Sequence, residues 1–117
     1  MRIKKIAQHE QWYPLPDESG KVLFRERTES DRDLLFEAMH FKASSGGDIT
    51  TDIARVYLDA IADWSGVEDE NGKALPCTPA NKRRFLAVPG MMDFVASGMR
   101  LVAQEGEAAR EAAGKNV

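Results

Sequence analysis

The sequence predicts an α+β fold, in which an N-terminal β-hairpin packs on a mainly helical domain of about four helices. Two early segments, residues 11–15 and 21–26, are rich in aromatic and β-branched residue types, as strands are. Further along, apolar residues recur at three- and four-residue intervals, which is the pattern of amphipathic helices. The chain has 117 residues and is 43% hydrophobic, so we expect one domain over residues 1–103.

The hairpin is predicted by the residues between its two strands. Pro16 presets φ and Gly20 can supply a positive φ, so residues 16–20 are suited to a chain reversal. Pro14 lies in the first strand and has no N–H to donate to a neighbouring strand. We therefore expect the first strand at an edge of the sheet or only partly paired.

Two helices are predicted in the middle of the chain. The first covers about residues 29–43 and stops at a loop over residues 44–47, which contains two serines and two glycines. The second begins after Asp48 or Thr50, ends at Ser65-Gly66 and is followed by a short turn before the next helix. The apolar stripe of this second helix consists of Ile49, Ile53, Val56, Tyr57, Ala60, Ile61 and Trp64.

The short turn and a third helix follow. Asn71-Gly72 favours a type I′ turn, in which two consecutive residues have positive φ, within a short hairpin or tight loop. Thr78 can cap a helix that starts at Pro79 and runs to about residue 87. Phe85 and Leu86 are expected on the inner side of this helix.

A fourth helix is predicted to start at about residues 89–91, and the composition of the chain changes after Ala103. Its apolar side chains are Met91, Met92, Phe94, Val95, Met99, Leu101 and Val102. They cover more than half of its circumference, which predicts contact with the core and with something else. Residues 104–117 are rich in Ala, Glu, Gly and Lys, so they are expected to fray into a polar, flexible tail, with a continued solvated helix as the alternative.

Composition argues against several functional classes. The net charge of -3 does not provide the cationic field that nucleic acids or anionic lipid surfaces attract. Charged or polar residues interrupt every apolar segment, so we expect no membrane span. Cys77 is the single cysteine, and no apolar leader is evident near the N-terminus. These features favour a soluble, cytoplasmic protein.

No motif predicts an enzyme, a metal site or a cofactor site. His9 and His40 are far apart and have no cysteine near them, so both are expected to be surface or capping residues rather than ligands. Gly46-Gly47 lacks the Lys and Ser/Thr of a phosphate-binding loop. Cys77 precedes a helix, whose dipole would favour its thiolate, but no sequence pattern supplies a base. A buried or half-buried thiol without a catalytic role is the expectation.

The sequence resembles the tail assembly chaperones of tailed bacteriophages and prophages over about residues 10–103. The most specific part is Trp64-Ser65-Gly66-Val67, followed by an acidic residue, the Asn71-Gly72 turn, the Thr78-Pro79 helix and the Val88-Pro89 break. The resemblance implies a small cytoplasmic protein that coats the tape-measure protein, helps recruit tail-tube subunits and is absent from the finished particle. A homo-oligomer is also compatible with it.

The apolar residues of the fourth helix are the candidate contact sites for a client or a second copy. We expect Met91, Met92, Phe94 and Met99 there, because unbranched thioether side chains adapt to many apolar contours, although methionines also fill gaps in cores. Trp12, Ile61 and Trp64 are the expected structural supports. A head-tail connector or tail-completion protein that stays in the virion is the alternative function, and a small hydrolase using Cys77 is a third.

Overall fold

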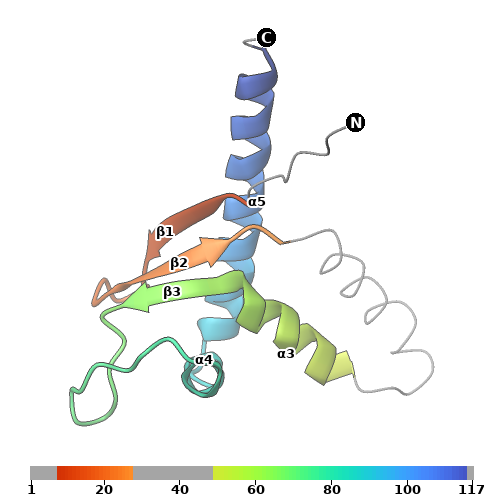
Figure 1. Cartoon of the computed structure of the whole chain (residues 1–117). Helices are drawn as coiled ribbons and strands as arrows, with labels where there is room; N and C mark the ends of the chain where they lie inside the picture. Colours follow the sequence, from red (N-terminus) through yellow and green to blue (C-terminus); the bar gives the residue numbers. More distant parts are fainter. Residues whose placement is uncertain (1–7, 28–48, 116–117) are drawn as a thin grey trace.

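The computed structural model describes residues 8–27 and 49–115, which form a three-stranded antiparallel sheet and three helices (Figure 1). The elements in chain order are β1 Glu10–Pro14, β2 Lys21–Arg25, α3 Ile49–Ala60, β3 Ile61–Ser65, α4 Pro79–Leu86 and α5 Met91–Lys115. The α+β class is confirmed. The prediction of about four helices does not match the three helices observed in this part of the chain. The expected helix at 29–43 and the loop at 44–47 lie outside the described residues.

The predicted hairpin is confirmed, and its first strand lies at the edge of the sheet, as Pro14 indicated. β1 pairs with β2, with Trp12 opposite Leu23, and the strand order is β1-β2-β3. The positive φ in the turn belongs to Glu18 (61°) and not to Gly20, which corrects the prediction for that glycine. Gly20 has a different role, because a Cβ there would collide with the carbonyl oxygen of Ser65.

The end of the second predicted helix is wrong. α3 ends at Ala60, and the next five residues form β3, which pairs with β2. Ile61 and Trp64 are three residues apart, a spacing that places two side chains on one face of a helix, so both were assigned to the second helix. On a regular strand, residues three apart point to opposite faces. The register shifts between Leu23 and Phe24, which leaves Ala62 as an extra residue in β3. This β-bulge lets both Ile61 and Trp64 turn their side chains into the core.

The core lies between the sheet and the helices, and α5 runs behind the sheet across its strands (Figure 1). Phe24 is fully buried at the centre, with its ring centroid 5.8 Å from that of Tyr13 and 5.5 Å from that of Phe94. Gly98 of α5 lies directly under the Phe24 ring, so closely that a Cβ at residue 98 would collide with the ring. This glycine therefore permits the contact between β2 and α5.

α5 continues as one helix to Lys115, so the expected boundary at residue 103 lies inside it. Beyond that point the helix still contacts buried Glu26, the residue that follows β2. The guanidinium of Arg110 donates two hydrogen bonds of 2.7 Å to the Glu26 carboxylate, one to each oxygen. Gly106 leaves room for that carboxylate, which lies 2.6 Å from where a Cβ would be. The polar composition after residue 103 thus does not end the helix.

The last predicted elements are mostly confirmed. α4 begins at Pro79, and the Thr78 hydroxyl accepts a hydrogen bond of 3.3 Å from the Asn81 N–H. Its Phe85 is buried and Leu86 is half-buried against the core. The tight loop near Asn71 is present, closed by a bridge between Glu68 and Ala74, but Gly72 is its one residue with positive φ (79°), so the turn is not type I′.

Candidate protein-binding groove

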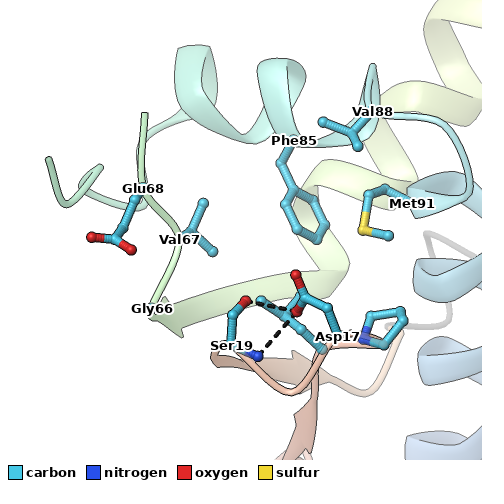
Figure 2. Close-up of a pocket in the computed structure, with 10 residues that line it drawn as sticks. Asp17, Ser19, Gly66, Val67, Glu68, Phe85, Val88 and Met91 are labelled. Atoms are coloured by element: carbon cyan, nitrogen blue, oxygen red, sulfur yellow. Dashed lines mark hydrogen bonds between the residues drawn. The ribbon is translucent and has the colours of Figure 1, made fainter. Parts of the chain in front are cut away.

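An apolar groove lies between the β1–β2 turn, residues 66–68, α4 and the start of α5 (Figure 2). Its volume is about 260 Å³. The residues that line it are Leu15, Pro16, Asp17, Ser19, Gly66, Val67, Glu68, Phe85, Val88 and Met91. Figure 2 shows the ring of Phe85 pointing toward the β1–β2 turn, with Val67 on one side and Met91 on the other. We call this site the Phe85 groove.

The break between α4 and α5 leaves an apolar side chain at the rim of the Phe85 groove. Gly90 has a φ of 87°, and the axes of the two helices differ by 110°. The N–H of Val88 donates to the carbonyl of Phe85, and the N–H of Met91 donates to the carbonyl of Val88, both at 3.1 Å. These bonds hold the Val88 backbone, yet its side chain remains 51% exposed.

Trp64 connects two of the groove-forming segments, residues 66–68 and α4. Its indole N–H donates a 2.7 Å hydrogen bond to the carbonyl of Leu75, and its ring centroid lies 5.5 Å from that of Phe85. The N–H of Leu75 in turn donates to the carbonyl of Val67 at 2.9 Å. Trp64 therefore connects β3 to the loop after it and to α4.

The four expected contact residues do not form one surface. Met91 lines the groove and Met92 beside it is 39% exposed, whereas Phe94 is half-buried against Phe24. Met99 is only 3% exposed and lies in the core, where it has no access to a partner in this conformation. The surface portion of the expected site is thus the Met91-Met92 pair at the start of α5, next to Val88.

The three residues expected as structural supports lie in two different environments, the core and the outer face of the sheet. Ile61 and Trp64 are buried in the core, where the bulge in β3 directs them. Trp12 is 37% exposed on the outer face of the sheet, and the ammonium of Lys21 lies 4.7 Å from its ring centroid. Its contact is therefore a surface cation–π pair rather than core packing.

The titratable groups do not assemble a recognisable catalytic or metal site in the described residues. No group of three or more His, Cys, Asp or Glu side chains there could hold a metal ion. Cys77 is half-buried as expected, and burial raises the pKa of its thiol, which disfavours the nucleophilic thiolate. His9 is half-buried with its Nε2 3.5 Å from Glu105, and His40 lies outside the described part.

No single helix among residues 8–27 and 49–115 has the length and hydrophobicity to span a membrane, although α4 and α5 together pass that test across their bend. The sequence matches no known protein-family model, and neither a curated protein nor a solved structure shows significant similarity to the chain.

Sequence reasoning missed the groove because four separate segments build it. Leu15 and Val67 flank turns and carry no periodic signal, so nothing in the sequence brings them beside Phe85. The one available signal was Val88, a large apolar residue immediately before Pro89-Gly90. A β-branched apolar side chain at a break between two helices is poorly placed to enter a core, and here it is exposed.

Proposed function

We propose that this chain is a tail assembly chaperone of a tailed bacteriophage or prophage, which acts by non-covalent cover of apolar surface. It would bind the tape-measure protein in the bacterial cytoplasm, help recruit tail-tube subunits and leave before the particle is complete. This proposal rests on the sequence resemblance over about residues 10–103 and includes no enzymatic step. A homo-oligomer is compatible with it.

One structural observation supports the proposal: apolar side chains remain accessible around the junction of α4 and α5. Val88 and Met92 are 51% and 39% exposed, and Met91 lines the adjoining groove. An unassembled protein with a long apolar stripe would aggregate unless something covered the stripe. The flexible side chains of Met91 and Met92 suit a binder that must fit a client surface of varying shape.

The alternative function, a connector or tail-completion protein, predicts a different fate for the chain. We expect mass spectrometry to detect the protein in infected or induced cells but not at stoichiometric amount in purified particles. We also expect it to co-elute with the tape-measure protein before tail tubes form. Stoichiometric recovery from finished virions would overturn the chaperone proposal in favour of a structural component.

A further inference from the structure

A second cavity extends the Phe85 groove along α4. It has a volume of about 230 Å³ and shares Val67, Glu68, Phe85 and Val88 with the first. Its remaining lining residues are Asp69, Glu70, Leu75, Asn81 and Arg84. The two cavities therefore adjoin at these four residues, and together they offer room for more than one apolar side chain of a bound segment.

The rim of this extended groove is strongly acidic. Its lining includes the four carboxylates of Asp17, Glu68, Asp69 and Glu70, against the single guanidinium of Arg84. Arg84 lies 3.8 Å from Glu70, so these two charges largely offset each other. The carboxylates of Asp17, Glu68 and Asp69 then remain without an ion-pair partner among the described residues.

Two of these three carboxylates are held in place by the chain itself. Asp17 accepts hydrogen bonds from the hydroxyl and the N–H of Ser19, which keep the pKa of Asp17 below its usual value. Asp69 accepts from the N–H groups of Asn71 and Lys73. The carboxylates of Asp17 and Asp69 are therefore already positioned before a partner binds, so less conformational entropy is lost when a cation binds beside them.

We propose that the extended groove binds a segment of a partner protein in which Lys or Arg residues flank apolar side chains. The apolar side chains would fill the two cavities, and the cations would lie against Asp17, Glu68 and Asp69. A segment with flanking carboxylates would meet like charges at the same rim, so the groove discriminates between the two. The inference rests on the proposed function, because it specifies the chemistry of the client segment.

Two synthetic peptides with identical apolar residues, and with either Lys or Glu at every polar position, test this inference. Fluorescence anisotropy should show that the Lys peptide binds the wild-type chain about tenfold more tightly than the Glu peptide at low salt. The preference should shrink at high salt, because exposed charges are screened. Equal affinity, a preference for the Glu peptide or no binding of either would overturn the inference.

A pair of charge-reversal variants assigns the preference to the groove. Glu68 is exposed at the rim, whereas Glu111 is exposed in the C-terminal part of α5. Figure 1 shows that this part of α5 lies away from α4. Glu68→Lys should remove most of the preference, and Glu111→Lys, with the same change in net charge, should preserve it. Equal effects of both variants would contradict a groove-specific site. If Glu68→Lys does not fold, the peptide preference of the wild-type chain and its decrease at high salt still test the inference.

Sedimentation of the same two variants distinguishes a partner protein from a second copy. If Glu68→Lys alone changes the oligomeric state, the groove binds another copy of this chain and the inference is wrong. A failure of the peptide test leaves the proposed function open to its own test, because recovery from particles and co-elution with the tape-measure protein do not depend on the charge of the bound segment.

Discussion

Replacing Phe24 with alanine should lower the free energy of unfolding by about 3–5 kcal/mol, the range for removing a large aromatic side chain from a packed core. Phe24 is fully excluded from solvent and lies between Tyr13, Phe94 and the backbone of Gly98. The rigid contact with Gly98 cannot easily close over the missing ring, because the sheet and α5 are both regular elements. Urea denaturation followed by circular dichroism measures the loss.

Leu23 provides the matched control for Phe24. It is the adjacent residue of β2 but points to the outer face of the sheet, opposite Trp12 and Asp63, where it is half-buried. Leu23→Ala should therefore cost clearly less than Phe24→Ala, about 1–2 kcal/mol, because it removes fewer carbons from a side chain that is only partly buried. Similar losses for the two variants would contradict the placement of α5 behind the inner face of the sheet.

Replacing Trp64 with alanine should also cost about 3–5 kcal/mol, and it should in addition loosen the Phe85 groove. The change removes the ring that packs on Phe85 and leaves the carbonyl of Leu75 without its indole donor. Residues 66–75 would then lose their main connection to β3 and α4. Hydrogen exchange should show faster exchange of the Leu75 N–H, measured under conditions where the variant remains folded.

Trp12 is the control for this variant, since both residues are tryptophans in strands of the same sheet. Trp12→Ala removes an exposed ring that contacts Lys21, a pair worth about 0.5–1 kcal/mol at the surface. The two substitutions should therefore separate clearly in urea. A loss for Trp12→Ala as large as that for Trp64→Ala would show that the outer face of the sheet is covered and not open.

The elements with strong local signals were predicted well from the sequence. The hairpin followed from the turn residues 16–20, and α4 followed from the Thr78 cap and Pro79. β3 could not be predicted, because the spacing of Ile61 and Trp64 satisfies both an amphipathic helix and a strand with one bulge. Pairing with β2 decides between the two, and that pairing is a long-range interaction.

The length of α5 and the groove depend on contacts that the sequence does not reveal. Residues 104–115 have the composition of a polar tail, but Ala and Glu favour the helical conformation, and the helix continues to Lys115. Arg110 in this segment donates hydrogen bonds to the buried carboxylate of Glu26. The methionines of this helix were expected as contact sites for a client or a second copy, because the apolar residues cover more than half of its circumference. Met92 and Met99 are seven residues apart, so a rotation of 100° per residue places them on nearly the same side of α5. Their different burial, 39% exposed for Met92 and 3% for Met99, therefore depends on what packs around each position and not on their spacing.

The most direct test of the proposed function is co-purification of the tape-measure protein with two double variants. Val88→Asp with Met92→Asp places two charges at the accessible apolar junction of α4 and α5, whereas Leu101→Asp with Ala108→Asp places them at other exposed positions of α5. Circular dichroism should be unchanged for both, since all four side chains are exposed. We expect the first variant to lose the client and the second to retain it. Retention of the client by the folded Val88→Asp, Met92→Asp variant would contradict the account.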